Sequence, residues 1–296
     1  MKSSIKKDMF YLLVKILSFI PDKVYLKGYY YIYTKHFLNI NNPKSFNEKL
    51  QWLKIYDQRD EYTKLVDKYE VRKMVADRLG EQYLIPLLGV WDKVEDIDFE
   101  TLPKQFVLKG THDSGSVVVC RDKSNWDIEA NKKFLKKRLN RNFYRVGREY
   151  PYKNVKPRVI AEKYMDGIDK KGLIDYKFFC FNGEVKFLYV SEGLEDHSTA
   201  HISFVSLDWK KEPYKRKDYA TFDELPPKPK TFEEMVKIAQ LLSKDIPFVR
   251  VDLYEVDEKV LFSELTFFPC SGVIPFEPYG YDKIIGEILD ISLIKK

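Results

Sequence analysis

Two carboxylates and an arginine fall on what the sequence predicts to be one face of a β-hairpin. Apolar runs at residues 248–254 and 260–267 flank a polar turn, a pattern typical of two antiparallel strands. Side chains alternate along a strand, so a turn at Glu258 brings residues of the two strands face to face. The pairs that we expect are Asp252 with Glu264 and Arg250 with Thr266.

Carboxylates beside an arginine suit a divalent metal ion and phosphate better than they suit apolar packing. The opposite face of this hairpin is apolar and can enter a core, with Val249, Val251, Leu253 and Leu265. The plain alternative is a solvated strand face with a cross-strand Arg–Glu pair. The hairpin by itself favours that alternative, so a metal or phosphate site is indicated only if other segments of the chain carry matching motifs.

A second candidate segment is the loop at residues 109–116, Lys-Gly-Thr-His-Asp-Ser-Gly-Ser, between two predicted strands. Small residues let backbone N–H groups approach phosphate oxygens closely, and Lys109 adds a cation. A Walker loop is excluded because a strand follows, where that motif requires a helix N-terminus. The pattern favours a flexible flap over nucleotide phosphates, although an ordinary polar turn accounts equally well for the loop alone.

Composition excludes several other classes of function. The 296 residues carry a formal charge of +6, a mild excess that suits an anionic substrate or an anionic membrane surface. Three dispersed cysteines argue against a disulfide framework and fit a reducing cytoplasm. The four histidines form no HExxH motif, which disfavours a zinc site. Recognition motifs for nucleic acid are absent, so we expect no nucleic-acid partner.

The beginning of the chain is apolar and aromatic. Residues 9–20 are apolar except for Lys15 and Ser18, a stretch too short to span a bilayer. No small-residue cleavage site follows it. A tyrosine-rich run follows at residues 29–33. We prefer a buried helix pair here, and keep peripheral membrane contact as the alternative.

Helices are expected over residues 1–56, where Ser45-Phe-Asn-Glu48 has the form of a capping box. Strands and helices mix in the rest of the chain, which predicts an α+β fold. Asn182-Gly183 predicts a hairpin turn between two strands. The polar segment 195–230 is expected to be a long surface excursion.

In this order the pieces resemble an ATP-grasp enzyme, and more closely the TupA-like ATP-grasp group of polysaccharide-modifying proteins. The resemblance covers most of the chain from about residue 40 onward. It implies an ATP-grasp fold with a helical region at 1–90, a lid subdomain at 91–165 and a metal-binding subdomain at 166–296. The segments that carry it are 45–52, 67–69, 106–115, 151–157, 175–183 and 264–267.

The resemblance assigns roles to individual residues. ATP would contact Lys68, Lys109, Ser114, Gly115, Ser116, Glu162, Lys163, Met165 and Asp175. Magnesium would be held by Asp252, Glu264 and Thr266, where Thr266 replaces the asparagine usual in the wider family and is a weaker ligand. Arg250 and Lys109 would serve catalysis. Candidates for substrate contact are Ser271, Gly272, Lys177 and His112.

The activity that the resemblance implies is ATP- and Mg²⁺-dependent ligation of a carboxylate to an amine through an acylphosphate. The substrates would be an amino acid or amine and a uronic acid of a bacterial capsule or cell-surface polysaccharide, or its precursor. Two alternatives stay open. One is a glycosyltransferase-type enzyme using Asp96-Ile-Asp98, and the other is an ATP-binding protein whose catalysis is impaired by Thr266.

Overall fold

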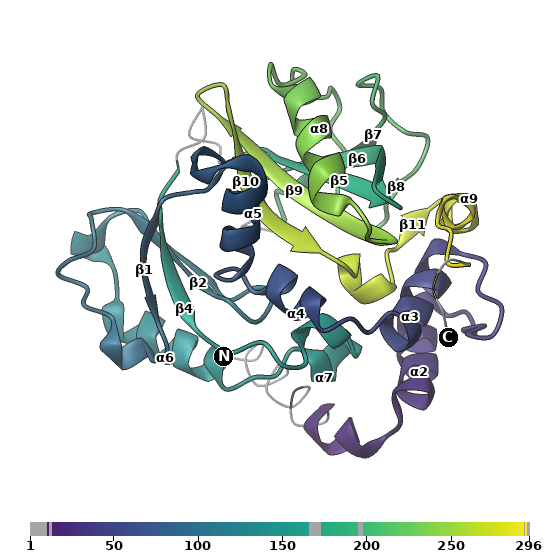
Figure 1. The fold of residues 1–296 in the computed structure, drawn as a ribbon, viewed down its shortest axis with the longest axis horizontal. Coiled ribbons are helices and arrows are strands. Elements are labelled where there is room, and N and C mark those ends of the chain that lie inside the picture. Colours follow the sequence, from purple (N-terminus) through teal and green to yellow (C-terminus); the bar gives the residue numbers. More distant parts are fainter. Residues whose placement is uncertain (1–10, 12–13, 166–172, 195–197, 293, 295–296) are drawn as a thin grey trace.

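Two antiparallel sheets organise the chain, a four-stranded sheet at the left of Figure 1 and a five-stranded sheet at its upper right. The computed structural model describes residues 11, 14–165, 173–194, 198–292 and 294. Helices pack on both sheets and fill the N-terminal region. The expected α+β class is therefore confirmed.

The N-terminal region is helical up to the first strand. Its helices are α2 (Asp22–Thr34), α3 (Phe46–Tyr56), α4 (Glu61–Val66) and α5 (Val71–Leu79). Helix α3 begins with the predicted capping box. The Ser45 hydroxyl accepts from the Glu48 N–H at 3.2 Å, and the Glu48 carboxylate accepts from the Ser45 N–H at 3.1 Å. Two of the N–H groups at the start of α3 are thereby satisfied.

The four-stranded sheet carries the glycine-rich loop. In sheet order its strands are β1 (Leu87–Trp91), β4 (Val159–Lys163), β2 (Phe106–Gly110) and β3 (Val117–Cys120). Helix α6 (Ile128–Leu139) packs on this sheet through the buried Leu135, which joins Phe106 and Leu108 in a small core. The expected boundary at residue 90 falls within β1, whose partner is β4. The loop at 110–116 connects β2 to β3 and so stands at the end of a hairpin.

The five-stranded sheet carries the acidic hairpin. In sheet order its strands are β10 (Lys259–Thr266), β9 (Phe248–Val256), β5 (Asp175–Phe181), β6 (Glu184–Glu192) and β7 (His201–Val205). Helix α8 (Phe232–Ser243) covers one face, where it contacts β9, β5 and β6. The predicted Asn182-Gly183 turn is confirmed between β5 and β6, with both residues at positive φ.

The register of β9 and β10 is the one that the sequence predicts. Glu264 pairs with Asp252, and Thr266 pairs with Arg250. The turn residues Asp257 and Glu258 both adopt positive φ, at 51° and 58°, as a tight hairpin turn requires. The opposite, apolar face is buried in the core, with Val249, Val251, Leu253 and Leu265.

The expectation of a surface excursion over residues 195–230 is wrong for two parts of it. Residues 201–205 form β7, the fifth strand of the large sheet, with Ile202 and Phe204 buried. Lys215–Arg216 forms β8, which pairs with β11 (Phe276–Glu277). The sequence of β7, His-Ile-Ser-Phe-Val, alternates as a strand does, and its partner β6 directly precedes it, so the polar composition of the whole segment hid a local signal. β8 has two polar residues and a distant partner, so local patterning could not reveal it.

Helix α9 (Tyr281–Ile288) packs on α3 and brings a buried carboxylate to the start of that helix. The Asp282 carboxylate accepts from the Asn47 N–H at 2.8 Å. Burial raises the pKa of Asp282 from its ordinary value of 3.8 to about 6. Between these two pH values the folded protein keeps a proton that the unfolded chain has released. The Asp282 contribution to stability therefore declines as the pH rises from about 4 to about 6.

We expect Asp282→Asn to increase the free energy of unfolding by about 2 kcal/mol at pH 7 and by little at pH 4. The amide oxygen can still accept from the Asn47 N–H, while the buried charge is gone. Urea unfolding of both proteins at the two pH values measures the difference. A variant that is less stable than the natural protein at pH 7 would show that the charge is needed.

Candidate nucleotide and metal site

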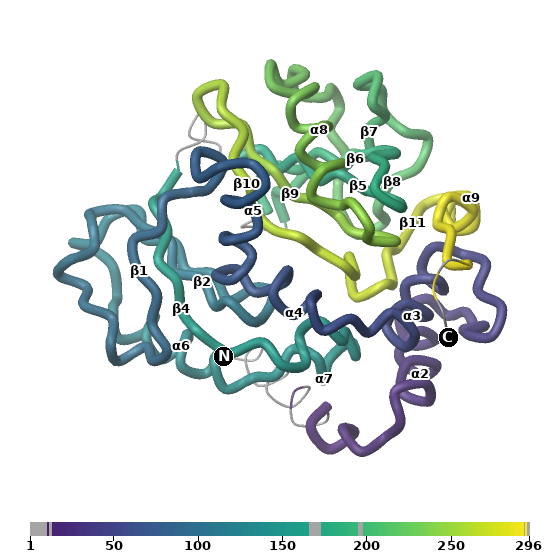
Figure 2. The backbone as a smooth tube through the Cα atoms, in the orientation of Figure 1, coloured from purple at the N-terminus to yellow at the C-terminus, as the bar shows by residue number. Residues whose placement is uncertain are grey.

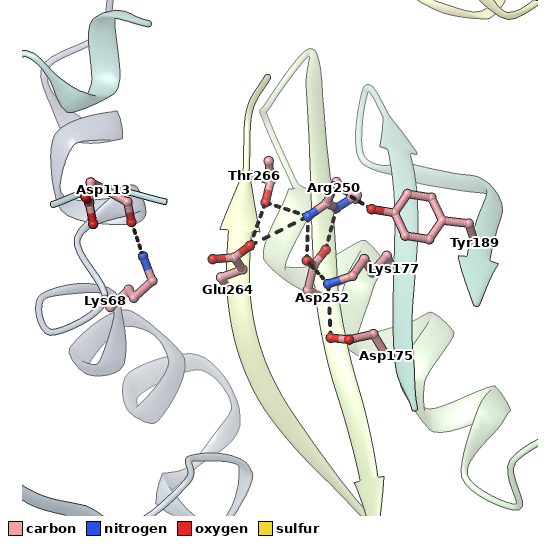
Figure 3. Close-up of polar contacts among 9 residues, drawn as sticks. All are labelled: Lys68, Asp113, Asp175, Lys177, Tyr189, Arg250, Asp252, Glu264 and Thr266. Carbon is pink, nitrogen blue, oxygen red and sulfur yellow. Dashed lines mark hydrogen bonds and ion pairs between the residues drawn. The ribbon is translucent and has the colours of Figure 1, made fainter. Parts of the chain in front are cut away.

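Arg250 is held in place by three side chains of the large sheet (Figure 3). Its guanidinium makes a two-point contact with Asp252, with Nε 2.7 Å from Oδ1 and Nη2 2.6 Å from Oδ2. It also donates to the Tyr189 hydroxyl at 2.9 Å and to the Thr266 hydroxyl at 3.0 Å. Such a fork geometry fixes the orientation of the cation as well as its charge.

Lys177 is a second buried cation in this cluster. Its ammonium group lies 2.7 Å from Asp252 Oδ2 and 3.0 Å from Asp175 Oδ1. Burial opposes its charge, but the carboxylates of Asp175 and Asp252 hold the pKa of Lys177 well above its usual value. Asp252 is fully buried, and both of its oxygens already face cations.

Tyr189 belongs to this cluster although the sequence reasoning missed it. It lies opposite Lys177 in the β5–β6 pairing. A count from the Asn182-Gly183 turn would have placed Tyr189 opposite Tyr176, because the bulge between Phe179 and Cys180 shifts the register by one residue. No signal in the sequence marks that bulge.

Glu264 is the carboxylate of the cluster that remains partly open, with a side chain 36% exposed. Its Oε1 accepts from the Thr266 hydroxyl at 3.3 Å and lies 3.6 Å from the Arg250 guanidinium. Burial raises the pKa of Glu264, but nearby cations outweigh burial and hold that pKa below its usual value. The cations responsible are Lys68, Lys177, Arg250 and Lys109. The charges of cations from both sheets and from the helical region thus act on one accessible carboxylate.

The acidic pair fits a magnesium ion that is shared with a bound phosphate. Among the residues that the structure describes, no group of three or more His, Cys, Asp and Glu side chains is placed to hold a metal ion. Mg²⁺ commonly takes only one or two carboxylates and completes its shell with phosphate and water. Glu264 offers an accessible oxygen for this purpose, while Asp252 is engaged by Arg250 and Lys177. The assignment of Asp252, Glu264 and Thr266 to the metal stays a prediction.

Lys109 and Glu162 form an ion pair on the four-stranded sheet. Lys109 Nζ lies 2.6 Å from Glu162 Oε2, and Arg72 approaches the other carboxylate oxygen at 3.1 Å. The two residues are diagonal neighbours, because Glu162 lies opposite Val107 in the β2–β4 pairing. Two of the predicted ATP contacts, Lys109 and Glu162, thus bind each other in this conformation.

The remaining predicted nucleotide contacts lie around these strands. Lys68 follows α4 and donates to the Asp113 carbonyl at 2.6 Å, which joins it to the glycine-rich loop (Figure 3). The Lys163 N–H donates to the Pro86 carbonyl at 2.9 Å. Met165 packs against a small apolar cluster that includes Ile85.

Arg138 organises the glycine-rich loop. It donates to the Ser116 hydroxyl at 2.7 Å and to the Ser114 carbonyl at 2.6 Å, and it lies 3.0 Å from the Asp113 carboxylate. Gly115, at the exposed tip, has a positive φ of 82°, which glycine adopts without strain. The Ser116 hydroxyl is buried and donates to Asp113. The loop is therefore held by Arg138 at the end of α6, a residue that the sequence analysis does not single out.

The model of one family, described as TupA-like ATP-grasp, matches residues 48–290. The chain belongs to the TupA-like ATP-grasp family. Membership confirms the resemblance and the ATP-grasp fold that the sequence predicts. A search of curated proteins finds no match.

Several solved structures share this fold at low identity. D-alanine–D-alanine ligase from Bacillus anthracis, complexed with ATP, is 17% identical with a TM-score of 0.45, over 77% of this chain and 66% of that chain. The ATP-grasp ligase PsnB, complexed with a phosphomimetic variant of its minimal precursor, Mg and ADP, is 8% identical with a TM-score of 0.41, over 71% and 52%. The TupA-like chain thus spans about half to two thirds of their lengths.

His112 does not join the site of this TupA-like protein. Its Nε2 lies 3.2 Å from the Arg138 carbonyl, at the end of α6, and its side chain is buried behind the loop. Burial lowers the pKa of His112. The histidine lines a cavity of about 340 Å³ together with Tyr152 and residues 139–142. This geometry gives no support to the prediction that His112 contacts the substrate.

Ser271 links two buried groups of opposite charge just after β10. Its hydroxyl donates to Glu149 Oε1 at 2.7 Å, and the Lys54 ammonium lies 3.3 Å from the same hydroxyl and 2.8 Å from the Ser271 carbonyl. Lys54 and Glu149 are almost completely buried. Burial lowers the pKa of Lys54 to about 8 and raises that of Glu149. We name Lys54, Glu149 and Ser271 the post-strand triad; its first two members had no signal in the sequence.

The backbone that carries Ser271 is itself constrained. Cys270, Ser271 and Gly272 have consecutive positive φ angles of 49°, 53° and 66°. The Gln51 amide donates to the Gly272 carbonyl at 2.7 Å and to the Ser271 carbonyl at 3.1 Å. A left-handed conformation at residues with side chains needs this kind of support. Helix α3 therefore holds the predicted substrate loop in its conformation.

We expect Arg138→Ala to weaken ATP binding about tenfold, because ATP must then order a loop that has lost three contacts. Titration calorimetry with a non-hydrolysable ATP analogue and Mg²⁺ measures the dissociation constant. Lys133→Ala, an exposed cation on the same helix, is the matched control for loss of charge. Equal affinity in all three proteins would show that Arg138 does not shape the phosphate loop.

Proposed function

We propose that this TupA-like protein is an ATP- and Mg²⁺-dependent ligase that joins an amine to a carboxylate through an acylphosphate. The observation that carries the proposal is the cluster of Arg250, Lys177, Asp252 and Glu264 on the large sheet (Figure 3). The charges of Lys68 and Lys109 also lower the pKa of Glu264. Cations around an acidic metal position suit the transfer of a phosphoryl group from ATP. The glycine-rich loop beside Lys68 supplies a cover for the phosphates.

The chain's own groups account for each step of such a reaction. A carboxylate oxygen attacks the γ-phosphorus and ADP leaves, which gives an acylphosphate. An amine nitrogen then attacks the carbonyl carbon, phosphate leaves, and the nitrogen loses a proton to form the amide. Lys68 and Lys109 would neutralise phosphate charge, and Arg250 would stabilise the charge on the transferring group and on the tetrahedral oxyanion. Mg²⁺, held by Glu264 with Asp252 behind it, would supply further neutralisation of the phosphates.

The post-strand triad and the turn that carries Ser271 are the place where we expect the carboxylate substrate to bind. Ser271 and Gly272 lie in the turn Pro269–Gly272, beyond the end of β10 at which Thr266 contacts Arg250, so a substrate on this loop would lie at the Arg250 end of the hairpin. Lys54 contributes a positive charge there. We propose a uronic acid of a bacterial cell-surface polysaccharide or its precursor as the carboxylate, and an amino acid or amine as its partner. ATP supply and the dispersed cysteines favour the cytoplasm as the place of reaction.

The test is a product assay with the full chain, ATP, Mg²⁺, uronic acids and a panel of amino acids. We expect ADP release that requires the uronate, and an amide product in mass spectra that also requires the amine. Hydroxylamine added in place of the amine should trap the acylphosphate as a hydroxamate. ADP release that depends on neither substrate, with no hydroxamate, would exclude the ligase.

A second candidate function is ATP binding without turnover. It is favoured by one observation: Asp252 and the Thr266 hydroxyl are already engaged by Arg250. The same assay decides, because such a protein would bind ATP and release no ADP with any substrate. The glycosyltransferase alternative has less support, since Asp98 caps the Glu100 N–H and Ile97 lies in the core of the four-stranded sheet.

A further inference from the structure

The outward side of helix α2 and of the segments next to it is apolar where exposed helices usually carry charges. Figure 2 shows α2 in purple at the lower right, at an outer corner of the molecule. Its outward side chains are between 45% and 86% exposed. We name the following residues the α2 face: Ile16, Phe19, Val24, Tyr31, Ile32 and Phe37.

The spacing along α2 makes this surface continuous. Val24, Tyr31 and Ile32 are separated by three-to-four-residue steps through Gly28, so they share one side of the helix. Leu26, on the other side, is fully buried. The Tyr31 and Phe37 rings stack at 5.1 Å between centroids, which extends the surface beyond the helix end.

Helix α6 shows what an ordinary exposed helix of this protein looks like. Its outward residues include Glu129, Lys133, Lys136 and Lys137, and Phe134 is the large apolar residue among its exposed positions. Exposed apolar residues that occur singly are common on any protein. A group of six on one short stretch of chain is of the size that marks an interaction surface.

Charge distinguishes between the surfaces that could cover the α2 face. The first 47 residues contain eight lysines and two aspartates, with no arginine or glutamate, so they hold a charge of +6. The whole chain also has a charge of +6, and the other residues are therefore neutral in sum. Lys23, Lys27 and Lys35 are exposed beside the apolar side chains. A second copy of the chain would bring like charges together here.

We infer that the α2 face docks on an anionic phospholipid bilayer. The apolar and aromatic side chains would enter the headgroup region, and the lysines would contact lipid phosphates, the arrangement by which amphipathic helices lie on membranes. No helix in the described part of the chain is long and apolar enough to cross a membrane, so the contact is peripheral. Docking does not depend on the ligase activity proposed above.

Flotation of the full chain with lipid vesicles tests this inference. We expect it to float with vesicles of phosphatidylglycerol and phosphatidylcholine, and at least about tenfold less with phosphatidylcholine alone. The variant Phe19→Ser/Ile32→Ser/Phe37→Ser should lower binding to anionic vesicles at least about tenfold. Lys23→Glu/Lys27→Glu/Lys35→Glu should lower it to a similar extent and abolish the preference for anionic lipid.

The matched control is Leu88→Ser/Phe134→Ser/Leu241→Ser, three exposed apolar residues outside the first 47. It should float like the natural protein, and circular dichroism checks that every variant is folded. Absence of flotation, or equal flotation of natural protein and α2-face variant, would overturn the inference. So would a lipid-free dimer that the α2-face variant converts to a monomer, because a second copy would then cover the face.

Discussion

Glu264→Gln is expected to lower kcat of the ligase reaction by at least about a thousandfold. Glutamine has the same size and can still accept from the Thr266 hydroxyl, so the fold should persist. What disappears is a negative charge next to Arg250, on which Lys68, Lys109 and Lys177 also act. Loss of this carboxylate removes the most accessible position for Mg²⁺.

Binding measurements give this substitution a signature that a folding defect would not produce. Without Mg²⁺, ATP should bind Glu264→Gln more tightly than the natural protein, since a negative charge near the phosphates is gone. With Mg²⁺ the order should reverse. Glu258→Gln, in the exposed turn of the same hairpin, serves as the control and should match the natural protein. Turnover of Glu264→Gln within about tenfold of normal would contradict the metal assignment.

Glu149→Gln is expected to reduce the free energy of unfolding by about 3 kcal/mol at pH 7, because Lys54 is then left buried without a counter-charge. The double variant Lys54→Met/Glu149→Gln should recover most of this loss, since neither partner is then a buried charge. Urea unfolding of the single and double variants measures both effects. A double variant no more stable than Glu149→Gln would show that the two charges do not interact.

The pH dependence of the same variant follows from Lys54. Its folded pKa of about 8 lies below its ordinary value of 10.5, so the unfolded chain binds more protons between these values. Stability from this group therefore rises with pH over that window. Removal of Glu149 lowers the folded pKa of Lys54 further, so the rise should begin at lower pH in Glu149→Gln. Unfolding curves at pH 6, 7, 8 and 9 measure where this rise in stability begins. A rise that begins at the same pH in both proteins would argue against the coupling between Lys54 and Glu149.

The core of the candidate site follows from local sequence patterns. Alternation along residues 248–266 and a turn near Glu258 predict the pairs Asp252 with Glu264 and Arg250 with Thr266, and both pairs are present. The structure reaches them through a two-residue turn and a bulge at Ser263, which local alternation does not predict. The glycine-rich loop is equally local, because two short strands directly flank it. Family resemblance placed these pieces in one nucleotide site, and the match over residues 48–290 confirms the family.

Side-chain partners were decided by the tertiary structure. Lys177 turns to Asp252 and Asp175, and Lys109 turns to Glu162, because neighbouring strands bring these charges within reach once the sheets form. Arg138 reaches the loop only because α6 ends beside it. His112, a candidate for substrate contact, instead lies against the Arg138 carbonyl at this same end of α6.

The sequence by itself determined the class of fold, the acidic hairpin and the phosphate loop, since each depends on residues within about twenty positions of one another. The tertiary structure alone decided the post-strand triad, whose members come from three distant segments of the chain: Lys54, Glu149 and Ser271. It also decided β8, a two-residue strand whose pairing with β11 depends on a distant partner and not on its own pattern. Polar contacts between distant segments stabilise the protein only once folding has brought the segments together and excluded water from them. No local sequence pattern therefore predicts these contacts.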